Sequence, residues 1–218
     1  MKPIFTGSLA GAHTLTRRSL MGLSLCLLCA CALPDKPQMA TLYDLGPPPE
    51  VKPGQMARWA GVVLDEVDVT PELDGTGLLY RLAYVDAQQL HPYANARWSM
   101  PPAQLLQQRL RQRLSPWTAV LNRNQAAGLH NQSAAAVELS VQLEEFSQFY
   151  SSPQSSQGWV SFRATLTRGT QLLGQRNFTV RRDAKAADAA AGARALAESS
   201  DEAIHQLSDW LRQIDGQT

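Results

Sequence analysis

All three cysteines of the chain lie within residues 26–31, and none follows Cys31. The residues before them begin with a segment that has three basic side chains and no acid, and continue with ten uncharged, mostly apolar residues at 19–28. This order is typical of a secretion signal, and the apolar run is too short to cross a bilayer as a helix. We therefore predict a signal peptide over residues 1–30. Without that segment the chain has no second cysteine for a disulfide, so it has to fold around a hydrophobic core.

The signal ends in Leu28-Cys29-Ala30-Cys31, which resembles the lipobox of bacterial lipoproteins. The resemblance implies cleavage between Ala30 and Cys31, with S-diacylglycerol on the Cys31 thiol and an acyl group such as palmitate on its amine. Ala32 stands where an Asp would favour the inner membrane, so the sorting pattern predicts an anchor in the outer membrane. Burial of two or three acyl chains, at about 0.8 kcal/mol per CH₂, makes such an anchor effectively permanent.

Two alternatives stay open for this segment. Cys31 could be an ordinary residue that follows a standard signal peptide. The run Thr16-Arg17-Arg18-Ser19-Leu20-Met21 also resembles a twin-arginine signal, so the export route is not fixed by the sequence.

Charge and composition exclude several classes of protein. The chain has 20 Lys and Arg against 19 Asp and Glu, and loss of Lys2, Arg17 and Arg18 changes the net charge from +1 to −2. A nucleic-acid-binding domain normally carries a marked basic excess, which is absent here. The 44% apolar content is too high for a disordered chain and is enough for one folded domain.

Alternating apolar residues predict a sheet in the mature chain. We expect a Pro-rich tether over residues 31–56, with a short first strand at 41–45, and a folded domain over residues 57–218. Strands are predicted at 58–69, 78–85, 91–98, 117–121 and 137–144, with a turn cluster at 151–158 and a hairpin over 159–168 and 172–182. Residues 122–133 are predicted as a polar loop.

Two helices are predicted from apolar residues at helical spacing. Pro101 and Pro102 open the first, Ser115-Pro116 ends it, and its apolar stripe is Ala103, Leu106, Leu110 and Leu114. The second covers about residues 186–214 and is expected to lie across the sheet. The predicted fold class is α+β: a single antiparallel or mixed sheet with one inserted amphipathic helix and a long C-terminal helix packed on it.

A search for catalytic and metal-binding motifs gives no candidate. Cys26-x-x-Cys29 has redox or zinc spacing but lies in the signal, and no phosphate-binding loop or hydrolase elbow is present. We predict no cofactor, no metal and no catalytic residue. The isolated histidines and the polar clusters are interpreted as solvated or structural, with a partner contact as the alternative for the arginines: His91, His130, His205, Glu144-Glu145, Arg109, Arg111 and Arg113. Neighbouring strand residues point to opposite faces, which is poor geometry for Glu144 and Glu145 to share acid–base work. The tryptophans are interpreted as core anchors, with a partner surface as the alternative: Trp59, Trp98, Trp117, Trp159 and Trp210.

Four short motifs occur in a familiar order over nearly the whole mature chain. They are Tyr43-Asp44-Leu45-Gly46-Pro47, Leu79-Tyr80-Arg81, the run from Arg97 to Leu106, and Asp209-Trp210-Leu211. Behind a lipobox, this order resembles the PqiC-like ABC-type transport auxiliary lipoprotein family.

The resemblance implies a non-enzymatic outer-membrane lipoprotein that faces the periplasm. Its implied partners are an MCE-domain protein and, through it, an inner-membrane permease and ATPase that move lipids between the membranes. It also implies self-association into a ring. The alternatives are a lipoprotein accessory for outer-membrane assembly, which binds lipopolysaccharide or a barrel protein, and a periplasmic hydrolase.

Overall fold

The computed structural model describes residues 39–51, 54–127 and 136–217. The chain divides into two compact units, Met1–Met39 and Ala40–Thr218, and nearly all described residues belong to the second. Ala30 and Cys31, the predicted cleavage and lipidation residues, lie outside the described residues, as does His130.

A single mixed sheet of nine strands forms the frame of the described part of the second unit. Its long strands are β7 (Val137–Ser152), β8 (Ser155–Arg168) and β9 (Gln171–Asp183), which run antiparallel to one another. The short strands are β1 (Thr41–Tyr43), β2 (Val62–Leu64), β3 (Asp68–Val69), β4 (Gly77–Leu82), β5 (His91–Trp98) and β6 (Val120–Leu121). The predicted α+β class with a mixed sheet is confirmed.

Strand β7 is the spine of this sheet. One of its edges pairs with β8, and the other pairs in succession with β2, β3 and β4, all parallel to it. The predicted strand at 58–69 is therefore two short strands, because the chain bends away from β7 between Leu64 and Asp68. A 3-10 turn, Pro71–Leu73, makes a second break before β4. Because of these breaks, loops lie between the short strands on this edge of β7, and their side chains can form clusters there.

Alternation along β7 changes phase at a β-bulge between Leu143 and Glu145. Before the bulge the odd-numbered residues are buried, and after it Phe146, Gln148 and Tyr150 take the same side. The predicted turn cluster at 151–158 is wrong, because β7 continues to Ser152 and β8 begins at Ser155. The predicted hairpin around Gly169-Thr170 is confirmed, and Gly169 has the positive φ of +55° that its turn requires.

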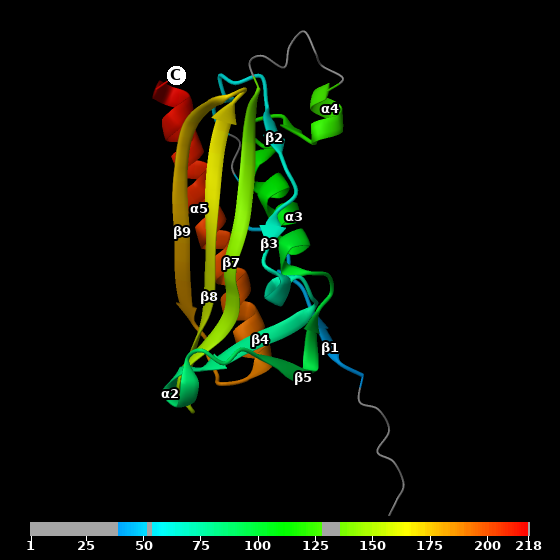
Figure 1. Cartoon of the computed structure of the whole chain (residues 1–218), viewed down its shortest axis with the longest axis vertical. Helices are drawn as coiled ribbons and strands as arrows, with labels where there is room; N and C mark the ends of the chain where they lie inside the picture. The colour runs from blue at the N-terminus through cyan, green and yellow to red at the C-terminus, as the bar shows by residue number, and fades with distance from the viewer. Residues whose placement is uncertain (1–38, 52–53, 128–135, 218) are drawn as a thin grey trace, which may run out of the picture. The chain divides into compact units, whose positions relative to one another are not determined.

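Helices α5 (Ala189–Gln217) and α3 (Pro102–Leu114) cover one face of the sheet, as Figure 1 shows. The predicted apolar stripe of α3 is buried. Early in α5 the small residues Ala191, Ala193 and Ala195 are buried, because here the helix lies almost on the strand backbone. A Cβ on Gly158 of β8 would lie 2.4 Å from the Ala195 carbonyl carbon.

A buried polar network fixes the N-terminus of α5. Gln148 is fully buried; its amide nitrogen donates to Ser156 Oγ at 2.8 Å and to the Asp188 carbonyl at 3.2 Å, and its Oε1 accepts from the Tyr93 hydroxyl at 2.9 Å. Burial and the hydrogen bond to Tyr150 raise the pKa of Tyr93 well above its ordinary value, so the donor keeps its proton. All polar atoms of the Gln148 side chain are thereby satisfied.

Two short helices were not predicted, α2 (Ala83–Asp86) and α4 (Arg123–Ala127). Helix α4 lies in the predicted polar loop and starts with a reciprocal cap: Gln125 N–H donates to Asn122 Oδ1 at 2.7 Å, and Asn122 N–H donates to Gln125 Oε1 at 2.9 Å. This is the Asn variant of a capping box, a signal that the sequence contained.

Substitution of Gly158 by Ala should lower the free energy of unfolding of the domain by about 1–3 kcal/mol or more, because the added methyl group has to displace the backbone of α5. Chemical denaturation of the Gly158→Ala variant measures the change. The control is Gly216→Ala near the end of α5, where nothing lies within 4 Å of an added Cβ and no loss is expected. Equal stability of Gly158→Ala and the wild type would contradict the close approach of α5 to β8.

Candidate functional site

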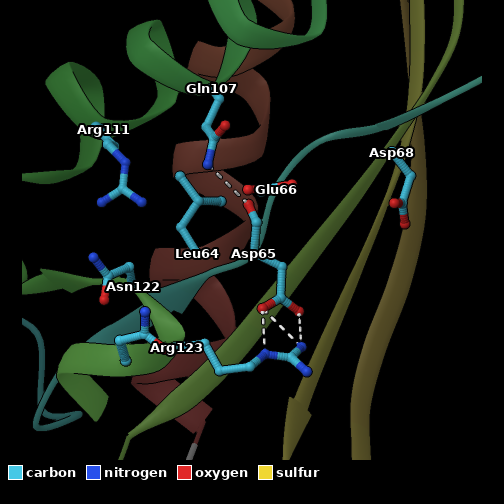
Figure 2. Close-up of a pocket in the computed structure, with 9 residues that line it drawn as sticks. Leu64, Asp65, Glu66, Asp68, Gln107, Arg111, Asn122 and Arg123 are labelled. Atoms are coloured by element: carbon cyan, nitrogen blue, oxygen red, sulfur yellow. Dashed lines mark hydrogen bonds and ion pairs between the residues drawn. The ribbon is translucent and has the colours of Figure 1, made fainter. Parts of the chain in front are cut away.

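A polar groove of about 610 Å³ lies between the β2–β3 connection, helix α3 and helix α4. Figure 2 shows its residues, which come from these three segments far apart in the sequence. The lining residues are Leu64, Asp65, Glu66, Asp68, Gln107, Arg111, Asn122, Arg123 and Asn124. A second hollow of about 540 Å³ shares Glu66, Gln107 and Arg111 with it and extends along α3 toward Met100. The two neighbouring hollows are called here together the α3 groove.

A bidentate ion pair between Arg123 and Asp65 connects the segments that line the α3 groove. Arg123 Nη2 lies 2.9 Å from both carboxylate oxygens of Asp65, and its Nε lies 3.2 Å from Oδ1. Ser140 Oγ donates to the same carboxylate at 3.1 Å, and Gln107 donates to the Asp65 carbonyl at 3.4 Å. The hydrogen bond and charge of Asp65 raise the pKa of Arg123 further above its ordinary value. This contact joins α4, β7 and α3 at the bend after β2.

Arg111 is a positively charged residue of the groove that forms no ion pair with the described residues. It is half-buried on α3, and its side chain has neither an ion pair nor a hydrogen bond among the described residues. The exposed carboxylate of Glu66 lies on the facing segment, and it also has no such partner within the described ranges. With the amides of Gln104, Gln107, Gln108, Asn122 and Asn124 around them, these groups offer hydrogen bonds and charges of both signs. The first hollow is lined almost entirely by polar side chains, which suits a polar protein segment. The second hollow adds apolar residues: Val67, Val69, Met100, Pro101 and Ala103.

The three arginines of α3 have three different environments. Arg109 is 4% exposed, so the interpretation of this side chain as solvated is wrong. It reaches the carbonyls of Leu45 and Gly46. Arg113 contacts His205 Nδ1 at 3.0 Å, and Arg111 lines the groove. Residues two apart on a helix point in different directions, and the burial of Arg109 depends on the segment that lies over α3.

Glu144 and Glu145 form separate ion pairs. Glu144 accepts from Arg163 at 2.6 Å, and Glu145 lies 3.1 Å from Arg81. The bulge between Leu143 and Glu145 breaks the alternation on which the expectation of opposite faces rested. Because each carboxylate has its own arginine, the two do not form a shared acid–base site.

The described histidines show no catalytic arrangement. His91 packs on the ring of Tyr80 with 5.5 Å between the centroids, and His205 pairs with Asp209 at 3.3 Å on exposed α5. Within the described ranges, no three His, Cys, Asp or Glu side chains come together as a metal site would require. None of the helices in those ranges is both long and apolar enough to cross a membrane.

Four of the five tryptophans are buried in the core, as predicted: Trp59, Trp98, Trp117 and Trp210. Trp159 is the exception, because it lies half-buried on the sheet face away from α5. Its ring contacts Phe149 edge-on at 5.7 Å, and the Arg181 guanidinium lies 3.9 Å from its centroid. A stacked arginine covers this ring within the domain.

Comparisons with known proteins give one family and one fold. The model of the family described as "ABC-type transport auxiliary lipoprotein component" matches residues 43–208. A crystal structure of a Xanthomonas campestris protein superposes with a TM-score of 0.65 at 19% identity, covering 82% of this chain and 100% of that one. A crystal structure of an uncharacterized protein gives 0.57 at 19% identity, with 79% and 99% covered. At this identity the two structures establish the fold alone. The comparison with curated proteins gives no match.

The adjacent glutamates provide a matched test of the ion pairs. Glu145→Gln should cost about 1.5–3 kcal/mol, because Glu145 and Arg81 are only 10% and 20% exposed and the arginine loses its anion. Glu144→Gln should cost less than about 1 kcal/mol, since its pair with Arg163 is 30% and 42% exposed. Urea denaturation at low and high salt measures both. An equal loss for the two variants would show that burial does not set the strength of these pairs.

Proposed function

The chain belongs to the ABC-type transport auxiliary lipoprotein family, and on that premise we propose that it docks a periplasmic MCE-domain protein at the outer membrane. In this proposal the MCE protein connects it to an inner-membrane permease and ATPase, and the system moves lipids or other hydrophobic molecules between the two membranes. The protein itself has a non-enzymatic role. The observation that carries the proposal is the match of the family model to residues 43–208, directly behind a lipobox.

The anchor in this proposal is Cys31. Residues 1–30 are removed as the signal peptide, and Cys31 carries the S-diacylglycerol and the N-acyl chain. The domain then remains on the periplasmic face of the outer membrane, because the burial of several acyl chains holds it there without any electrostatic attraction. The net charge of −2 for the processed chain is consistent with an anchor of this kind, since it offers no attraction to anionic lipid.

The α3 groove is the surface that we assign to the partner. Arg111, whose side chain has no partner in the part of the chain that the structure describes, can take a carboxylate, and the amides around it can pair with a peptide backbone. The charged and amide side chains around Arg111, with the apolar residues that line the second hollow, fit a protein segment of mixed character. Self-association into a ring is also part of the proposal, and native mass spectrometry of the acylated protein measures it.

A lipoprotein that helps to assemble the outer membrane is the competing function. Gene neighbourhood separates the two, because an MCE protein and a permease next to the gene support docking, whereas a barrel insertase supports the alternative. Affinity purification of the acylated protein, followed by mass spectrometry of its bound proteins and lipids, makes the same distinction biochemically.

The Cys31→Ala variant should lose membrane fractionation while the domain stays folded, because the acyl chains are the only proposed attachment. Fractionation of membranes after a high-salt wash, with circular dichroism of the soluble variant, measures both properties. A variant that still sediments with the outer membrane after the wash would show that the anchor lies elsewhere.

The Arg111→Glu variant should recover roughly tenfold less MCE partner in the purification, because it places a like charge against the carboxylate that we assign to the groove. Arg194→Glu is the matched control: it makes the same charge change at an exposed position of α5, outside the groove. Thermal unfolding of both variants should match the wild type. Equal recovery with both variants would exclude the groove as the docking surface.

A further inference from the structure

Arg109 is a buried arginine that serves the backbone of another segment. It lies in the middle of α3 and is 4% exposed. Its Nη2 donates to the Leu45 carbonyl at 2.5 Å and to the Gly46 carbonyl at 2.8 Å, while its Nε lies 3.4 Å from Asp201 on α5. One guanidinium therefore joins α3, α5 and the chain that follows β1.

The segment held by Arg109 has few other attachments. Strand β1 pairs with β5 over only three residues, Thr41 to Tyr43, and it lies at the edge of the sheet. Behind it the Leu45 side chain is buried, and Gly46 has a φ of +68°, stabilised by its N–H donating to Asp44 Oδ1 at 2.7 Å. The residues from Gly46 to Glu50 are exposed. A three-residue edge strand is a weak attachment by itself, so the buried arginine is a major part of what holds this segment.

The hydrogen bonds from Arg109 to the Leu45 and Gly46 carbonyls form a structural contact, called here the joint. The surroundings of Arg109 do not provide a ligand site. The cavity beside it, between Pro48, Pro49 and Asp201, measures only about 20 Å³. That volume accommodates about one water molecule. The guanidinium is thus aimed at the backbone of the N-terminal segment, and no ligand of larger size fits beside it.

We infer that Arg109 fastens the membrane tether to the domain and so sets the reach of the anchored protein. The inference rests on the proposed lipidation of Cys31. With the joint closed, the chain from Cys31 to Thr41 spans at most about 35 Å. With it open, the next fixed points are Ala57, whose N–H donates to the Trp117 carbonyl at 2.8 Å, and Arg58–Trp59, whose backbone N–H groups donate to the Asp215 carboxylate at 3.0–3.3 Å. The span from Cys31 to Ala57 is then up to about 90 Å. Arg109 therefore keeps the domain close to the membrane that carries its anchor.

Hydrogen exchange of the full-length acylated protein in detergent micelles tests this inference. In Arg109→Met, amides of residues 41–46 should exchange at least tenfold faster than in the wild type, while those of α5 keep their protection. Arg113→Met is the matched control, because Arg113 lies on the same helix and lines the same cavity but does not touch Leu45 or Gly46. Its residues 41–46 should exchange as in the wild type.

A second variant covers the case in which Arg109→Met does not fold. Asp44 is exposed, so Asp44→Ala leaves the core intact but removes the hydrogen bond that shapes the Gly46 turn. It should raise the exchange of residues 41–46 at least threefold. Unchanged exchange in the variants, or an equal rise in Arg113→Met or throughout the domain, would overturn the inference.

A protease experiment on isolated membranes connects the joint to the anchor. Glu50 is the first glutamate after Cys31, so cleavage after Glu50 by a glutamate-specific protease releases a fragment that begins at Val51. This fragment should appear at least tenfold faster from Arg109→Met than from Arg113→Met, and equal rates would contradict the joint. If the protein is absent from the membranes before the protease is added, the proposed lipidation of Cys31 is wrong. The exchange comparison repeated in a Cys31→Ala background then tests the joint separately.

Discussion

The backbone of β7 has to be paired along both edges, and the rest of the domain is arranged around that requirement. A strand of 16 residues cannot leave its hydrogen-bonding groups buried without partners. β8 satisfies one edge over almost its whole length, whereas the other edge is divided among β2, β3 and β4. Because these three strands are short, the chain bends outward between them. The bend after Leu64 carries Asp65 and Glu66 into contact with α3 and α4, and it forms the α3 groove.

Arginines serve different purposes on the two sides of α3. On the groove side, Arg123 is bound by Asp65 while Arg111 has no partner among the described residues. On the opposite side, Arg109 is buried against main-chain carbonyls and Asp201. Burial desolvates the Asp201 carboxyl and raises its pKa, and the charges of Arg109 and Arg113 act against that rise. Arg109 Nη1 has no hydrogen-bond partner among the described residues, so the two carbonyls that Nη2 reaches are the hydrogen-bond acceptors of this buried charge. A buried charge is costly to separate from such acceptors, which suits a joint, and a half-exposed charge without a described partner is available for binding.

Sequence patterns predicted most of the secondary structure but not its interruptions. The helix from Pro102 to Leu114, the hairpin around Gly169 and the long C-terminal helix follow from local signals: proline at a helix start, alternation, and an apolar stripe. The bulge between Leu143 and Glu145 was not predicted, because a strand with one extra residue contains the same kinds of residue as a regular strand. The extension of β7 and β8 into residues 151–158 was missed because Ser, Pro and Gly there resemble a loop. Gly158 is in fact required by contact with α5.

The sequence by itself determined the α+β class and the order of motifs that identifies the family, because each depends on neighbours along the chain. Only the tertiary structure decided which polar side chains form ion pairs and hydrogen bonds within the domain. Asp65 and Arg123 are 58 positions apart, and Arg109 lies 64 positions from Leu45. No local pattern encodes such contacts, since they arise where the pairing of strands in one sheet brings distant segments against the same helix. For the same reason, the three arginines at alternate positions of α3 differ: Arg109 binds the Leu45 and Gly46 carbonyls, Arg113 contacts His205, and the Arg111 side chain has no partner among the described residues.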